Sequence, residues 1–241
     1  YDSRKVEENS VFVCISGAAF DGHKFIGQVI EKGAKVIVVQ QDVEAPKGVT
    51  VIRFDDTRKA LAEMSAAYFG YPAEELTTIG ITGTKGKTTI TYMIQSVLEH
   101  AGQKTGLIGT IETVIGDERI PSVNTTPESY VIQESFRKMA DAGCKNVVME
   151  VSSQGLMLHR VSGFTFDYGI FTNLAEDHIG ENEHKDMDDY IRCKSLLFQQ
   201  CRQGIVNGDD DYVERIIKGH TCSLETFGMK PGSDVYADHI E

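Results

Sequence analysis

The sequence predicts an α/β fold, with a small N-terminal α/β domain followed by a P-loop-type domain that has a largely parallel sheet. Short apolar runs rich in β-branched residues alternate along the chain with stretches of helical spacing, and this alternation is typical of βαβ units. A glycine-rich turn also follows one of these runs and leads directly into a helical stretch. Strand, glycine turn and helix is the order that a phosphate-binding site requires.

The first domain is expected to cover residues 1–75. Its predicted strands lie at residues 11–16, 35–40 and 49–54. An amphipathic stretch over residues 21–33 separates the first two strands, and apolar side chains at helical spacing predict a helix over residues 56–69. The sequence Gly70-Tyr71-Pro72 ends that helix. Polar residues then precede a new strand, so we place the domain boundary after residue 75.

The second domain is expected to cover residues 76–241. Its predicted strands lie at residues 76–82, 105–110, 145–151, 168–174, 204–207, 222–227 and 234–240, with a hairpin over 112–120. Its predicted helices lie at residues 87–101, 127–142, 187–200 and 210–218. Strands that alternate with helices on this scale predict the largely parallel sheet. A strand-like pattern runs to the last residues, so we expect the chain to be a truncated piece of a longer protein.

Composition and charge exclude several classes of protein. The 241 residues are 41% apolar and 25% charged, which is typical of a globular chain. The net charge of −12 repels a phosphate backbone, so we expect no nucleic-acid partner. The longest apolar runs are far shorter than the ~20 residues of a membrane span, and the first ten residues do not resemble a signal peptide. Five cysteines without a CxxC pair argue against a disulfide framework or zinc site and favour the cytoplasm.

A phosphate loop is the strongest motif, and its predicted ATP-binding residues are Gly83, Thr84, Lys85, Gly86, Lys87, Thr88 and Thr89. The glycines allow backbone N–H groups to surround phosphate oxygens, Lys87 can reach the β- and γ-phosphates, and the Thr88 hydroxyl can bind Mg²⁺. The general pattern GxxxxGK[ST] expects glycine where Ile81 stands, so the match is incomplete. The alternative is a plain strand-to-helix turn, which would leave the Lys-Thr pair without a role. The motif therefore indicates a P-loop ATPase-type domain.

The chain resembles the Mur ligase family over nearly its whole length. The segments that carry the resemblance are Asp2-Ser3-Arg4 with residues 11–13 and Asp21-Gly22-His23; residues 81–89; Asn124-Thr125-Thr126-Pro127-Glu128; Glu150-Val151-Ser152-Ser153; and Thr172-Asn173-Leu174 with Asp177-His178 and Tyr190-x-x-x-Lys194. The loop alone suits any member of the Mur and folylpolyglutamate synthase group. The first and third segments are similar to the branch that adds the third residue of the peptidoglycan stem peptide.

Three residues outside the loop are expected catalytic and metal-binding groups. Glu150 ends a predicted buried strand, where its carboxylate can hold Mg²⁺ beside Thr88; the alternative is a solvated strand end. His178 by itself is typical of a surface loop, and Lys194 of an exposed helix position. The resemblance implies that His178 binds a second Mg²⁺ and that Lys194 is carbamylated and binds it too. With Lys87, these are the catalytic residues that the resemblance implies, with ATP as co-substrate.

The resemblance also implies two groups of substrate-binding residues. Asn124, Thr125 and Thr126 would bind the UDP-muramoyl substrate together with Ser152 and Arg160. Taken alone, Thr126 can equally be a helix N-cap followed by Pro127 at the first helical position. The uridine-binding positions in the first domain, which make it the UDP-binding domain, are Ser3, Asp21, Gly22 and His23. Without the resemblance these four residues predict only a turn and a helix start.

The implied function is an ATP-dependent amide ligase of peptidoglycan precursor synthesis. It would join a diamino acid, meso-diaminopimelate or L-lysine, to UDP-MurNAc-L-Ala-D-Glu through an acyl phosphate, and the diamino acid would bind a C-terminal domain that has no counterpart here. Two alternatives stay open: a folylpolyglutamate-synthase-like ligase, and a module that binds nucleotide or UDP-sugar without turnover. Departures from the family pattern are Lys85, Gln154 and the loop over residues 179–185, which leaves the local metal geometry open.

Overall fold

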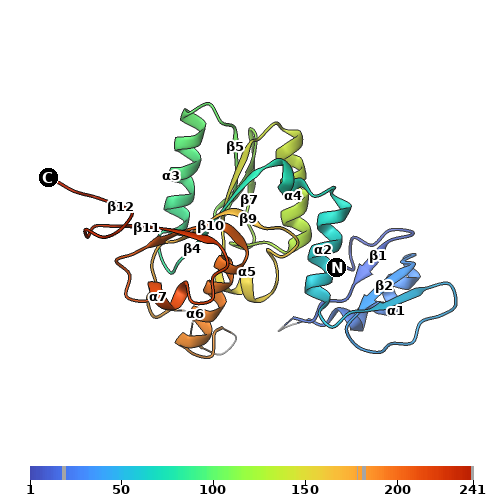
Figure 1. The fold of residues 1–241 in the computed structure, drawn as a ribbon. Coiled ribbons are helices and arrows are strands. Elements are labelled where there is room, and N and C mark those ends of the chain that lie inside the picture. The colour runs from blue at the N-terminus through green and yellow to red at the C-terminus, as the bar shows by residue number, and fades with distance from the viewer. Residues whose placement is uncertain (18–19, 178, 181–182, 240–241) are drawn as a thin grey trace. The chain divides into compact units, whose positions relative to one another are not determined.

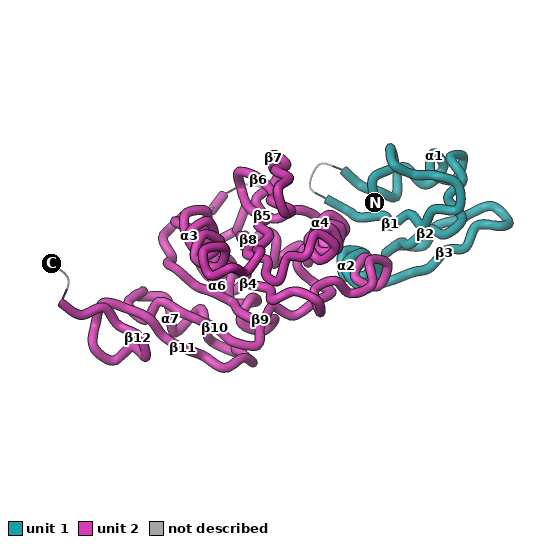
Figure 2. The backbone as a smooth tube through the Cα atoms, turned by 90° about the horizontal axis from the view of Figure 1, so that it is seen from above, with its two compact units in different colours: residues 1–64 teal, residues 65–241 magenta. Residues whose placement is uncertain are grey.

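The computed structural model describes residues 1–17, 20–177, 179–180 and 183–239, and the chain divides into two compact units, residues 1–64 and 65–241 (Figure 2). The division falls inside helix α2 (Thr57–Tyr68), which the sequence predicts almost to the residue. The functional boundary after residue 75 stays a prediction. In the described parts of the chain, no helix is long and apolar enough to cross a membrane.

The first unit contains a three-stranded parallel sheet in the order β1-β2-β3. The strands are β1 (Val11–Val13), β2 (Val36–Val39) and β3 (Thr50–Arg53), and the 3-10 helix η1 (Gly22–Phe25) and helix α1 (Ile26–Glu31) connect the first two. Apolar side chains of β1, α1 and β2, including Phe12, Val29 and Ile37, form its core. Each predicted element is present, with the first strand shorter than expected.

The second unit contains a sheet with the order β12-β11-β10-β9-β4-β8-β5-β6-β7 among the described residues. The strands are β4 (Thr77–Thr82), β5 (Thr105–Ile108), β6 (Glu112–Ile115), β7 (Glu118–Pro121), β8 (Asn146–Glu150), β9 (Phe166–Phe171), β10 (Cys201–Asn207), β11 (Ser223–Gly228) and β12 (Val235–Tyr236). Within these residues the β5–β6 and β6–β7 pairs are antiparallel and the other pairs are parallel, which confirms the largely parallel sheet and the predicted hairpin. The carboxyl ends of β4 and β8 thus meet at one edge.

Helices cover both faces of this sheet (Figure 1). They are the 3-10 helices η2 (Pro72–Glu75) and η3 (Leu196–Gln199) and the helices α3 (Lys87–His100), α4 (Ser129–Asp141), α5 (Ser153–Met157), α6 (Met187–Ser195) and α7 (Val213–Ile216). Val148 of β8 packs with Ile90 and Ile94 of α3, whereas its neighbours Val147 and Met149 pack in the cluster that contains Phe136 of α4. Because side chains alternate along a strand, α3 and α4 lie on opposite faces.

Several elements differ from the sequence prediction. Strands β9 and β10 begin two and three residues earlier than predicted, because parallel pairing with their neighbours extends them. Helix α4 begins at Ser129 instead of Pro127, and only the four residues of α7 are α-helical in the stretch predicted as the helix 210–218. The short helix α5 was not predicted. All five cysteines are free and buried.

Candidate active site

A tight loop of residues 83–86 joins β4 to α3, and two of its positions require glycine. A Cβ atom on Gly83 would collide with the Thr172 hydroxyl oxygen, so no larger residue fits. Gly86 has a φ of 81°, in the left-handed region that favours glycine. The backbone therefore turns directly from the strand into the helix. The first N–H groups of α3 have no partner within the helix and are suited to bind an anion.

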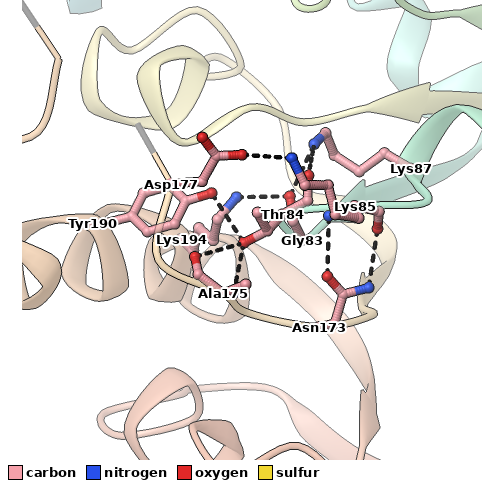
Figure 3. Close-up of polar contacts among 9 residues, drawn as sticks. All are labelled: Gly83, Thr84, Lys85, Lys87, Asn173, Ala175, Asp177, Tyr190 and Lys194. Atoms are coloured by element: carbon pink, nitrogen blue, oxygen red, sulfur yellow. Dashed lines mark hydrogen bonds and ion pairs between the residues drawn. The ribbon is translucent and has the colours of Figure 1, made fainter. Parts of the chain in front are cut away.

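Two lysine side chains converge on this loop from different helices (Figure 3). Lys87 Nζ donates to Gly83 O at 2.8 Å and to Thr84 O at 3.2 Å, and Lys194 Nζ of α6 donates to the same Gly83 O at 2.9 Å. Lys194 is only 1% exposed. Burial, and then the charge of Lys87, hold the pKa of Lys194 well below its ordinary value, and burial also lowers the pKa of Lys87. The sequence alone predicted an exposed Lys194, and that interpretation is wrong.

The segment after β9 fixes the outer side of the loop (Figure 3). The Asn173 side chain accepts from Lys85 N at 3.0 Å and donates to Lys85 O at 3.0 Å. The Thr84 hydroxyl lies 3.2 Å from the Tyr190 hydroxyl of α6, and Lys85 Nζ pairs with Asp177 at 2.7 Å. The loop is therefore held on one side by residues 173–177 and on another by α6. Sequence spacing gave no sign of these contacts, because Asn173 and Lys85 are 88 residues apart.

Thr88 and Glu150 meet at the carboxyl ends of adjacent strands, as the sequence predicts. Thr88 Oγ1 donates to Glu150 Oε2 at 3.0 Å, and Glu150 is 1% exposed, so the alternative of a solvated strand end is wrong. The backbone N–H of Thr110 donates to the other carboxylate oxygen at 2.8 Å. A hydroxyl and a carboxylate beside a phosphate loop are hard oxygen donors, and this donor set fits Mg²⁺. Thr110 is a contact that sequence reasoning missed.

Residues predicted to bind the muramoyl substrate form a linked group next to Glu150. Thr126 Oγ1 donates to Glu150 O at 3.0 Å and accepts from Ser152 N at 3.0 Å. Helix α4 begins at Ser129 with Glu128 at its N-cap, so the interpretation of Thr126 as a helix N-cap is wrong. Ser152 is instead the N-cap of α5, and its hydroxyl accepts from Gly155 N at 3.0 Å. Thr126 and Ser152 thus hold the loop that follows β8.

Arg160 completes this group. Its Nη1 donates to Thr126 O at 3.0 Å, and its Nε lies 3.0 Å from Glu128 Oε1. The hydroxyl of Thr125 lies 3.0 Å from that of Thr110, while Asn124 is exposed. Part of the Arg160 guanidinium is therefore already bound within the protein, which orients the remaining N–H groups.

In the first unit, Asp21, Gly22 and His23 form the predicted turn and helix start. Asp21 Oδ1 accepts from His23 N at 3.1 Å and lies 2.6 Å from His23 Nδ1, and these bonds to His23 lower the pKa of Asp21. A Cβ on Gly22 would lie 2.9 Å from Cys14 Cα, so the turn requires glycine. Ser3 O accepts from Lys32 Nζ at 2.8 Å. These contacts show a well-ordered turn and leave the uridine-binding role a prediction.

The structure thus brings the predicted loop, Thr88, Glu150 and Lys194 together. Thr89 is exposed on the first turn of α3. His178, the remaining predicted metal ligand, lies outside the described residues. Sequence reasoning missed the buried His184, which contacts Ser153 and Asp189. The only signal for it in the sequence was a histidine three residues before a predicted helix.

Comparisons with known proteins agree with the geometry. A family model described as the Mur ligase middle domain matches residues 81–241, and one described as Mur ligase family, catalytic domain, matches residues 1–69. UDP-N-acetylmuramoyl-L-alanyl-D-glutamate–2,6-diaminopimelate ligases from Clostridium perfringens and Clostridium botulinum are 48% and 45% identical. These matches cover 100% of this chain and 50% of each relative. The chain therefore spans about half the length of the curated relatives it matches.

Solved structures show the same fold. A UDP-N-acetylmuramoyl-L-alanyl-D-glutamate–2,6-diaminopimelate ligase superposes with a TM-score of 0.85 at 24% identity, covering 98% of this chain and 50% of that one. The FolC protein of E. coli, in complex with DHPP and ADP, reaches a TM-score of 0.53 at 18% identity, covering 69% of this chain and 46% of that one. Two family models therefore match successive parts of the sequence, and one of them covers most of it. The chain belongs to the Mur ligase family.

Proposed function

We propose that this chain is the UDP-muramoyl-binding and ATP-binding part of a cytoplasmic ligase that adds a diamino acid to UDP-MurNAc-L-Ala-D-Glu. The observation that carries the proposal is the placement of the Thr88–Glu150 pair and the buried Lys194 around one phosphate loop. The printed names of the relatives support the substrate class. The folylpolyglutamate synthase alternative is less well supported, because the matches to E. coli FolC and to Mycobacterium tuberculosis folylpolyglutamate synthase cover 69% to 71% of this chain.

Amide formation explains why such a protein consumes ATP. A carboxylate is a poor acylating agent, so the D-glutamate carboxylate first attacks the γ-phosphorus of ATP and ADP leaves. The amine of the diamino acid then attacks the acyl carbon, and phosphate leaves. Lys87 and the loop N–H groups stabilise the charge on the transferred phosphoryl group. Thr88 and Glu150 would hold magnesium, which would neutralise negative charge on the phosphate oxygens.

Lys194 is suited to become a carbamate. Its buried amine has a pKa well below the ordinary value, so the neutral form is available. The neutral nitrogen attacks the carbon of CO₂, forms a C–N bond and releases a proton, which leaves an anionic carbamate. The product has hard oxygen donors of the type that magnesium prefers. An ammonium at the same position would be repelled by a divalent cation.

Each unit carries residues that we assign to the substrate. The group made by Thr125, Thr126, Ser152 and Arg160 lies beside Glu150. Thr126 already donates its hydroxyl proton to Glu150 O, so the donors that we assign to an anionic muramoyl dipeptide are the hydroxyls of Thr125 and Ser152 and the Arg160 guanidinium. The turn at residues 21–23 in the first unit is the proposed uridine site.

Calorimetry with this chain tests the assignment. We expect saturable binding of UDP-MurNAc-L-Ala-D-Glu and no saturable binding of free diaminopimelate or lysine, because no residue of these 241 is assigned to the diamino acid. The dipeptide L-Ala-D-Glu without UDP-MurNAc serves as the matched control and should bind much more weakly. Saturable binding of lysine or diaminopimelate, or equal binding of the free dipeptide, would contradict the assignment.

A further inference from the structure

We propose that His184 is a positioning residue that ties the loop after β8 to helix α6 and so fixes Lys194 relative to Glu150. The inference rests on the proposed function, because it concerns the two sides of the same magnesium site. Glu150 ends β8, and Lys194 lies on α6. A link between β8 and α6 therefore determines whether Glu150 and Lys194 are close enough to bind magnesium at the same site.

His184 makes a hydrogen bond at each end of its ring. It is 0% exposed, with Nε2 2.8 Å from Ser153 Oγ and Nδ1 3.1 Å from Asp189 Oδ2. An ionised carboxylate can only accept, so Nδ1 carries a proton and donates to Asp189. In the neutral ring Nε2 then accepts from the Ser153 hydroxyl. A buried ring with its proton on Nδ1 therefore bonds to both partners.

Each partner of His184 leads directly to the active site. Ser153 is the first residue of α5 and follows Ser152, which is bound to Thr126 next to Glu150. Asp189 lies in the first turn of α6, and the same helix directs Tyr190 to Thr84 and Lys194 to Gly83. The chain of hydrogen bonds therefore connects the carboxylate side of the site with the lysine side.

A second partner, Arg192, keeps the Asp189 carboxylate ionised. Arg192 Nη2 donates to Asp189 Oδ1 at 2.7 Å, and the bond to Arg192, followed by that to His184, lowers the pKa of Asp189. The group therefore remains an acceptor. The ligand atoms of His184, Asp189 and Cys193 also lie within 4.8 Å of one another, as in a metal site. Both ring nitrogens are engaged, however, and Arg192 Nη2 lies 3.5 Å from Cys193 Sγ, which places a cation where a metal would bind.

Two substitutions of His184, each of which removes one of its two hydrogen bonds, distinguish a role in linking Ser153 to Asp189 from a role in packing alone. Asn in place of His184 keeps a donor near the Nδ1 position and loses the bond to Ser153, whereas Gln keeps a polar group near Nε2 and loses the bond to Asp189. Ser153→Ala removes one bond with little change in volume, so it stays informative if the histidine variants fold poorly. Cys193→Ser is the matched control, because Cys193 is buried on α6 and has no bond to His184 in the described contacts; its Sγ donates to Asp189 Oδ1 at 4.0 Å, and the serine hydroxyl keeps a donor at that position.

The readout is Mg²⁺ affinity, measured by titrating magnesium into each folded variant with the non-hydrolysable analogue AMP-PNP. We expect about a tenfold weaker affinity in H184N, H184Q and S153A, the range found when a partner that orients a metal ligand is lost, and less than a twofold change in C193S. Adding Ser153→Ala to H184N should weaken binding no further, because that bond is already gone. Affinities within twofold of the parent in folded H184N, H184Q and S153A would overturn the inference, as would an equal loss in C193S.

A Thr88→Ala variant distinguishes this inference from the proposed function. If T88A lowers Mg²⁺-dependent binding of AMP-PNP and the His184 and Ser153 variants do not, the magnesium site stands and the positioning role is wrong. If T88A binds Mg²⁺ and AMP-PNP like the parent, the proposed ATP site itself is wrong.

Discussion

Turnover of ATP by the complete gene product is expected to fall about 10³-fold or more, or about 4 kcal/mol of transition-state stabilisation, when Lys87 is replaced by alanine. Lys87 is the first residue of α3, and its ammonium lies against the loop carbonyls of Gly83 and Thr84. From this position it can move to the β- and γ-phosphates when nucleotide binds. The measurement is substrate-dependent release of ADP.

Lys138→Ala is the matched control for this change. Lys138 lies in the last turn of α4, its side chain is 52% exposed and it pairs with Glu134 of the same helix. Exposed pairs of this kind contribute little, so parent-like turnover is expected. Parent-like turnover in Lys87→Ala would instead show that the phosphate loop is misassigned.

Lys194→Ala is expected to lower ligase activity at least about 10²-fold, and a small carboxylic acid such as acetate should restore part of it. The physical reason is that the variant lacks the proposed carbamate oxygens, and an added carboxylate can occupy their place as a hard donor. Activity of the complete gene product is measured with and without acetate. Lys138→Ala receives the same acid and should not respond.

The carbamate proposal also predicts how the ligase activity depends on pH. Burial holds the pKa of Lys194 below its ordinary value, so the amine is neutral over a wider range, and acid protonates it and reverses carbamate formation. The activity of the parent should therefore fall as pH is lowered. The activity of Lys194→Ala with acetate should fall less over the same pH range, because this variant has no amine at position 194 to protonate. Activity unaffected by Lys194→Ala, or a free Lys194 amine in a substrate-bound and metal-bound crystal structure, would defeat the carbamate proposal.

Local sequence patterns were sufficient for most of the fold. The alternation of strands and helices predicted nearly every element, because each βαβ unit is encoded by neighbouring residues. Element ends were less predictable. β9 begins at Phe166 although Asp167 interrupts its apolar pattern, since that carboxylate accepts hydrogen bonds from the backbone and hydroxyl of Thr78 on β4. Such a partner, 89 residues away, is invisible in a local window.

The site shows the same division between local and distant information. Glycines 83 and 86 and the Lys87-Thr88 pair were recognised because the loop is continuous in sequence. The burial of Lys194 was not predicted, because it depends on the packing of α6 against a loop that lies 111 residues earlier in the sequence. The role of Thr126 was ambiguous for a related reason. Thr-Pro before a helical stretch is typical of an N-cap, but in the structure the Thr126 hydroxyl donates to Glu150 O at the end of β8.

Transfer of oxygen between the two substrates tests the central claim most directly. UDP-MurNAc-L-Ala-D-Glu labelled with ¹⁸O in its D-glutamate carboxylates is incubated in unlabelled water with ATP, Mg²⁺, diaminopimelate and the complete gene product, and the phosphate released is analysed by mass spectrometry. If an acyl phosphate forms, one carboxylate oxygen leaves with the phosphoryl group, so each phosphate released with the new amide should carry one ¹⁸O. Phosphate without ¹⁸O would contradict the account, because ATP would then be hydrolysed by water, and binding of the substrate without any phosphate release would identify a module that does not catalyse the reaction.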